Sequence, residues 1–303
     1  MKSRRNGAAV IAILTVGAVA SNASAHGTAH NIAFWESLKQ KNFKLSRPEL
    51  AGALSLEAGG LLSSTQSELR DGIGYEALSA WIYRDEALPP DQMESLRIEL
   101  VRRAQVGLGE TADDRVFGRS FAVLSLSLIA AEDLKRPFLS RAAFAELLDL
   151  GLAALARERD LRGYVKGKGW AHATAHAADL LKFLARNSKL TPSEGNRIVA
   201  GITARLRTAG QVFVWGEDAR LAAALGSLAL REDVDVAPFA AWCGQVGIDN
   251  RSVWSGTFDA ARYVPLRTEL NTMAQLAAIL QPGAGERADE IARALRTALL
   301  DSG

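Results

Sequence analysis

The sequence predicts an all-α protein made of stacked helix pairs. Apolar residues recur at three- and four-residue spacing along almost the whole chain, and the alternation typical of strands is rare. Alanine and leucine are abundant throughout, and both residues favour helix. Hydrophobic residues make up 48% of the 303 residues, which is enough for a large core in one long domain or in a repeat array.

The first 25 residues carry the three parts of a secretory signal peptide. Basic residues come first, an uncharged apolar run follows at 8–20, and small residues at 23–25 form a cleavage signature. The apolar run of about 13 residues is shorter than a transmembrane helix, which needs roughly 20. We therefore expect cleavage of residues 1–25 and export of a single helical repeat domain, residues 26–303, to the periplasm or the medium, with no transmembrane segment left.

The mature chain is close to neutral, because the leader holds basic residues and no acidic one. Neutrality gives no support for nucleic acid as a partner, and we expect none. Cys243 is the only cysteine, so an intramolecular disulfide is impossible. We expect its thiol to be a buried apolar group rather than a nucleophile, because no histidine lies near it in the sequence.

Capping signals indicate where several helices begin. Ser140 and Thr191 are N-cap candidates, and Thr191 is followed by Pro192 and Glu194, which suit the first turn of a helix. We expect a last repeat from Pro265 to Leu300, with its final helix as a cap.

Four segments share one layout, a polar turn with glycine that runs into an apolar helix. We call them the marked segments, and their turns the marked turns. They begin at Arg70, Gly118, Gly167 and Trp215, about 48 residues apart. This period suits α-α hairpin repeats stacked as a HEAT-like superhelix or an open α/α array. If the four helices form an inner layer, their N-termini meet along one edge, where free N–H groups suit anions or polar ligands.

The same segments resemble a known family. "RDGIGY", "GRSFAVLSL", "DLRGYVKGKGWAHATAHAADLL" and "WGEDARL", in this order, are similar to the uncharacterised bacterial family called domain of unknown function 2785. The resemblance covers roughly residues 60–235. It implies the helical fold and the placement of the turns, and it brings no established activity.

A possible metal site lies in the third segment. His172, His176 and Asp179 follow at i, i+4 and i+7, so one helix face can present two imidazoles and a carboxylate. This spacing could hold zinc with a fourth ligand from elsewhere. Alternatively, the histidines form hydrogen bonds within the inner face, and Asp179 fixes a tautomer or pairs with Lys166 or Lys168.

The turn before this helix is the densest polar and aromatic cluster in the chain. Its glycines allow a close approach of the backbone, Lys166 and Lys168 add positive charge, and Tyr164 and Trp170 offer stacking faces. The turn could bind a phosphate or a sugar, or it could be an ordinary solvated turn with Trp170 in the core. We expect the other tryptophans, Trp215 and Trp254 among them, to belong mainly to the core.

Charged residues of the marked turns offer a second possible chemistry. Two converging carboxylates among them could act as general acid and base, as in glycan hydrolysis. The alternative is that arginines pair with carboxylates and tie neighbouring repeats together. The carboxylates are Asp71, Glu76, Asp179, Glu217 and Asp218, and the arginines are Arg70, Arg119 and Arg220.

These patterns lead to one expectation about function and two alternatives. We expect an exported protein that binds a small polar or anionic ligand, or a peptide, on a concave face. The alternatives are an envelope hydrolase that uses the metal site or a carboxylate pair, and a scaffold without catalysis. The ligand-binding candidates are Arg70, Asp71, Tyr75, Arg119, Lys166, Lys168, Trp170, Glu217, Asp218 and Arg220; the metal candidates are His172, His176 and Asp179.

Overall fold

The computed structural model describes residues 30–111, 113–255 and 257–300. In this part of the chain the fold is all-α, as the sequence predicts, and it contains one two-stranded hairpin that the sequence does not predict. The predicted signal peptide lies outside the described residues. No helix in the described ranges combines the length and the apolar character needed to cross a membrane.

The helices follow one another with short connections. The long helical run from Ser67 to Arg84 contains two π-helical stretches, Arg70–Tyr75 and Ala80–Arg84, on either side of α4. The elements are α1 (Ile32–Gln40), a 3-10 turn (Pro48–Leu50), α2 (Ala51–Leu61), α3 (Ser67–Leu69), α4 (Glu76–Ser79), α5 (Pro90–Ala104), α6 (Arg115–Lys135), α7 (Arg141–Arg157), β1 (Tyr164–Val165), β2 (Gly169–Trp170), α8 (Ala173–Ala185), α9 (Pro192–Thr208), α10 (Glu217–Ala229), α11 (Ala237–Val253), α12 (Ala260–Ile279) and α13 (Glu286–Leu300).

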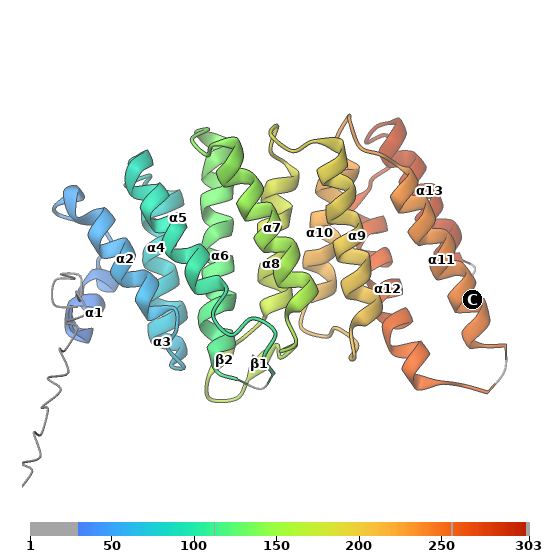
Figure 1. The fold of residues 1–303 in the computed structure, drawn as a ribbon, viewed down its shortest axis with the longest axis horizontal. Helices are drawn as coiled ribbons and strands as arrows, with labels where there is room; N and C mark the ends of the chain where they lie inside the picture. The colour runs from blue at the N-terminus through green and yellow to red at the C-terminus, as the bar shows by residue number, and fades with distance from the viewer. Residues whose placement is uncertain (1–29, 112, 256, 301–303) are drawn as a thin grey trace, which may run out of the picture.

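The helices stand side by side in two layers (Figure 1). In that view the front layer holds α2, α5, α7, α9 and α11, and the rear layer holds α4, α6, α8, α10 and α12. Neighbours in the rear layer pack directly, α6 against α8, α8 against α10, and α10 against α12. A continuous cluster of buried apolar side chains, from Trp35 to Ala298, holds the two layers together. Burial of this apolar surface is the main stabilising contribution.

Local capping confirms two of the expected helix starts. The Ser140 hydroxyl accepts a hydrogen bond from the Ala143 amide, and Thr191 forms a capping box with Glu194. These bonds satisfy amides in the first turn that have no partner inside the helix. The expected start of the last repeat at Pro265 is wrong, because α12 begins at Ala260 and Pro265 lies inside it.

The third marked segment contains a hairpin before its helix. Residue Tyr164 pairs with Trp170, and Val165 pairs with Gly169. Gly167 and Gly169 have φ of +78° and +82°, a region that glycine enters without steric cost. His172 follows with φ of 52° as the N-cap of α8, so the helix begins only after the hairpin has ended.

Candidate functional site

Three exposed aromatic side chains meet where α8 and α10 begin. Tyr164, Trp170 and Trp215 are 51%, 37% and 45% exposed. The Trp170 ring lies 5.4 Å from Tyr164 and 5.9 Å from Trp215, both edge to face, and it stacks on His172 at 4.9 Å. We call these four side chains the aromatic surface. Contiguous exposed rings of this kind are typical of binding sites.

Local backbone geometry brings the four rings together. The antiparallel pair of the hairpin sets Tyr164 opposite Trp170, which places their side chains on the same face. Trp215 lies directly over Gly163, where an added Cβ would stand 2.1 Å from the Trp215 Cδ1 atom. His172 Nε2 donates a hydrogen bond to the Trp215 carbonyl at 2.9 Å. Only glycine at position 163 allows this arrangement of the rings.

A line of rings continues from the aromatic surface into the core. His176 lies 5.6 Å from His172 and 5.0 Å from Phe121, and Phe121 lies 6.1 Å from Tyr75. Phe121 lies in α6 and His176 in α8, whereas Tyr75 directly precedes α4 and His172 directly precedes α8. The four marked segments therefore do come together, at the edge where their helices begin.

The hydrogen bonds of Ser120 define the tautomer of His176. The Ser120 hydroxyl donates to the Ala171 carbonyl at 2.5 Å and lies 2.7 Å from His176 Nδ1. Because the hydroxyl has one hydrogen, Nδ1 must carry the proton that joins it to Ser120. His176 then cannot take a proton from Ser120, and the serine is almost fully buried. This pair does not have the geometry of a serine hydrolase.

Burial keeps both histidines neutral. It lowers the pKa of His172, and it lowers the pKa of His176 well below its usual value, with the neighbouring imidazole adding to the effect. Burial also raises the pKa of Tyr75 to about 12, and the nearby carboxylate of Asp179 contributes to this shift. The site therefore presents neutral rings rather than imidazolium charges near pH 7.

The structure does not support the predicted metal site. No group of three potential ligands that could hold a metal ion occurs in residues 30–111, 113–255 and 257–300. His172 precedes α8 and uses Nε2 on a carbonyl, so it does not continue the helix face. The Asp179 carboxylate pairs with Arg220 and with Lys182. Asp179 therefore does not set the tautomer of either histidine. His176 Nδ1 is bonded to Ser120, and His172 Nε2 is bonded to the Trp215 carbonyl.

Charged groups border the aromatic surface on the α10 side. The Arg220 side chain is half exposed and pairs with Asp179 of α8 through one nitrogen. Glu217 is buried and accepts a hydrogen bond from the Trp215 amide at 2.9 Å, so it positions the tryptophan. Asp218 lies half-buried in the first turn of α10, and its carboxylate accepts from the Ala219 amide.

Arg70 is completely buried and connects the long helical run to the hairpin through hydrogen bonds. Its guanidinium donates to the carbonyl oxygens of Ser64 at 2.9 Å and Lys168 at 2.7 Å, and it lies over the Phe117 ring. Its Nε lies 2.7 Å from Asp71, and burial raises the pKa of that carboxyl. The bond to the Lys168 carbonyl holds the hairpin against the long helical run. The ion pair of Arg70 is with the adjacent residue Asp71, so it does not join two repeats.

Lysines of the hairpin have different surroundings. Lys168 pairs with Asp114, and Lys166 is exposed on the hairpin turn. Of the two, only Lys166 has no ionic partner among the described residues.

Arg119 does not share the aromatic surface. It pairs with Glu158 through two hydrogen bonds, of 2.6 and 2.9 Å, and both side chains are buried. Arg119 and Ser120 are successive helical residues, so their side chains point in directions about 100° apart. Ser120 faces α8, whereas Arg119 lines a separate cavity of about 310 Å³. The expected single pocket is therefore divided.

Sequence reasoning missed some members of this site. Trp215, expected in the core, is 45% exposed and belongs to the aromatic surface. Trp254, also expected in the core, is 61% exposed but lies elsewhere, beside Phe258 and Tyr263. The position of Trp215 in a glycine turn, equivalent to that of Trp170, was the available signal. Ser120 and Phe121 contact His176 only because α6 packs against α8 in this orientation. A local sequence pattern does not predict that orientation.

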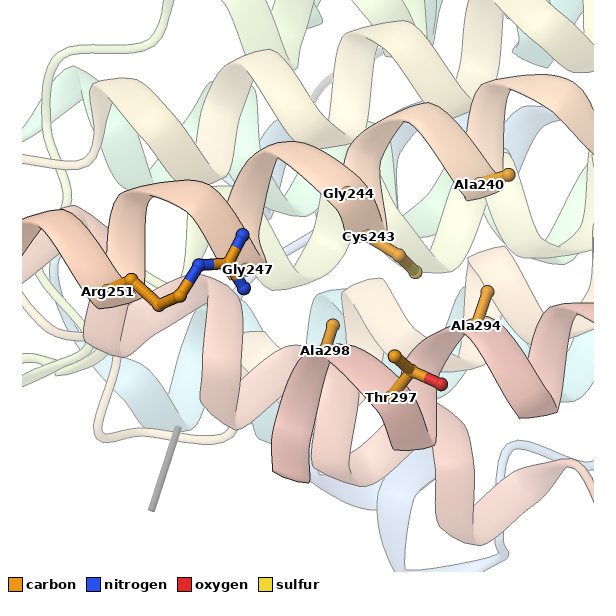
Figure 2. Close-up of a pocket in the computed structure, with 8 residues that line it drawn as sticks. All are labelled: Ala240, Cys243, Gly244, Gly247, Arg251, Ala294, Thr297 and Ala298. Carbon is orange, nitrogen blue, oxygen red and sulfur yellow. The ribbon is translucent and has the colours of Figure 1, made fainter. Parts of the chain in front are cut away.

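A shallow pocket between α11 and α13 carries little chemistry. Figure 2 shows Cys243 projecting from α11 toward Ala294 and Ala298 of α13. The pocket has a volume of about 280 Å³ and is lined mostly by small residues. Burial raises the pKa of the Cys243 thiol to about 12, so the thiol stays protonated and unreactive.

The family of the chain follows from a match to a family model. A model described as "Protein of unknown function (DUF2785)" matches residues 105–279. The chain belongs to this family. The DUF2785 match contains the aromatic surface and both histidines, begins after the segment at Arg70, and extends through α12. No curated protein and no solved structure matches the chain.

Proposed function

We propose that the protein binds a small polar ligand with negative charge on the aromatic surface. The observation that carries this proposal is the group of three exposed rings in mutual contact, with Trp170 stacked on a neutral histidine. Flat ligand faces, such as those of sugar rings, stack on tryptophan. Buried side chains position the rings, so little ordering is needed when the ligand binds.

The charges at the border favour an anionic group on the ligand. Arg220 is half exposed and uses only one nitrogen for Asp179, and Lys166 is exposed on the hairpin turn between Tyr164 and Trp170. Both cations can reach solvent, whereas Glu217 and Asp179 are buried. An acidic sugar combines the stacking face with the negative charge that these cations select.

Hydrolysis at this site receives less support than binding. Glu217 and Asp179 are both buried, Glu217 receives an amide hydrogen bond, and Asp179 is ion-paired. A general acid and base must both reach the substrate, and of the three carboxylates at this border only Asp218 is not buried.

A screen with matched variants tests the binding proposal. Acidic sugars, neutral sugars and short peptides are compared by thermal shift, and positive compounds are measured by calorimetry. We expect acidic sugars to bind, and Trp170→Ala to weaken binding tenfold or more, about 1.4 kcal/mol. Trp254→Ala, at an exposed tryptophan on another loop, should leave affinity unchanged. Binding that survives both Trp170→Ala and Trp215→Ala would refute the proposal.

We also propose that the two-layer array is a HEAT-like superhelix and that the protein acts outside the cytoplasm. The stacking of rear-layer neighbours and the regular spacing of the marked turns support the first point. The three-part pattern of residues 1–25 supports the second. N-terminal sequencing of protein from a cell fractionation tests export, and an intact N-terminus in the cytoplasmic fraction would refute it.

A further inference from the structure

A second cavity lies between α9, α11 and α12, away from the residues of the aromatic surface. Its volume is about 310 Å³, which is enough for a free amino acid. Four charged side chains line it together with apolar residues of α11 and α12. The charged side chains are Arg207, Asp249, Arg262 and Glu269.

Glu269 is a buried carboxyl with one oxygen left for a ligand. Its side chain is 3% exposed, and Oε1 accepts hydrogen bonds from Trp242 Nε1 at 2.9 Å and Arg207 Nε at 3.2 Å. None of the described residues donates to Oε2. Burial raises the pKa of Glu269, which shows that this carboxyl lacks full compensation for its lost hydration.

Pro265 leaves a backbone carbonyl at the cavity lining without its usual α-helical donor. A proline inside a helix has no N–H for the carbonyl four residues earlier, which here is that of Ala261. Both Ala261 and Pro265 line the cavity. Asp249 also lines it; its Oδ1 accepts a hydrogen bond from Gln245, and none of the residues that the structure describes donates to its Oδ2. Acceptors from two helices therefore surround the same space.

Two guanidinium groups supply donors beside these acceptors. Arg207 is partly exposed and contacts Glu269 through Nε, and within the described residues its terminal nitrogens form no hydrogen bond. Arg262 donates from Nη2 to the Ser252 hydroxyl at 2.6 Å, and no carboxylate of the described residues pairs with it. A free guanidinium edge can hold a carboxylate with two parallel hydrogen bonds.

We propose that this cavity binds a free amino acid as a zwitterion. Arg262 and Arg207 hold the ligand carboxylate, and the Ala261 carbonyl, Asp249 and Glu269 Oε2 accept from its ammonium group. The site places donors and acceptors in one small cavity, so neither a simple anion nor a simple amine uses all of them. This binding is independent of the aromatic surface.

Calorimetry on the full mature chain tests the proposal with individual amino acids, and with acetate and methylammonium as half-ligands. At least one amino acid should bind, and each half-ligand should bind at least tenfold more weakly. Arg262→Ala should weaken the amino acid at least tenfold, and its exposed position keeps the fold intact. Glu269→Gln keeps the shape of the side chain and tests whether the carboxylate binds the ammonium group of the ligand.

Two controls separate this site from others. Arg197→Ala removes an exposed arginine of α9 that pairs with Asp149, and Trp170→Ala removes the aromatic surface; both should leave amino acid binding unchanged. The proposal is overturned if no amino acid binds, if Arg262→Ala binds as tightly as the wild type, or if acetate alone binds equally well.

Discussion

The buried pair of Arg119 and Glu158 gives a quantitative test of how the site is held. Glu158→Ala removes two hydrogen bonds to a guanidinium that is 2% exposed. It also removes the acceptor for the backbone amides of Arg159 and Asp160. Loss of one partner from a buried ion pair costs about 3–5 kcal/mol, because the other charge stays buried without compensation.

Urea unfolding at pH 7 measures this loss directly, since the midpoint falls while the slope stays the same. The control is Asp149→Ala, which breaks an exposed pair with Arg197 and should cost about 0–1 kcal/mol. Replacing both Arg119 and Glu158 by methionine should recover the part of the loss that comes from the uncompensated charge, but not the part that comes from the amides of Arg159 and Asp160. If Glu158→Ala costs no more than the control, the buried pair is not an anchor for the loop that leads to Trp170.

Three further outcomes follow from the same contacts. Gly163→Ala should displace Trp215, change the near-ultraviolet dichroism of the tryptophans and destabilise the fold by about 1–3 kcal/mol; Gly210→Ala, where an added Cβ meets nothing within 4 Å, should do neither. Burial lowers the pKa of His176 in the folded chain, so its contribution to stability is complete above about pH 6.5 and is lost as the pH falls from there toward the lower folded value. His176→Gln should therefore flatten the fall in urea stability between about pH 6.5 and 5, and an unchanged slope would contradict the assignment. Cys243, whose thiol pKa is raised to about 12, should resist a disulfide reagent at pH 8 in the native protein and react in urea; rapid native labelling would show that the thiol is accessible.

The sequence predicts the helices well where their starts depend on local chemistry. Ser140 and Thr191 cap α7 and α9 through bonds within a few residues, so the sequence pattern contains the whole interaction. Pro265 does not start a helix, although proline favours the first turn, because it lies inside α12.

The site was harder to predict, because its geometry depends on contacts between elements. The spacing of His172 and His176 suggested a common helix face, but the hairpin places His172 outside α8 in a left-handed conformation. Arg119 carries the expected charge, yet it faces Glu158 rather than the rings. Periodicity indicates that a residue faces a neighbour, and tertiary packing decides which neighbour that is.

The packing of the rear layer also determines the order in which the helices unfold locally. In the rear layer, α8 packs mainly against α6 and α10, and α10 packs mainly against α8 and α12. The aromatic surface lies where α8 and α10 begin. Opening should therefore start at the two ends of the array, where a helix has a neighbour on one side only. In hydrogen exchange, amides of α8 should be among the slowest, so the rings stay assembled while α1 and α13 fray.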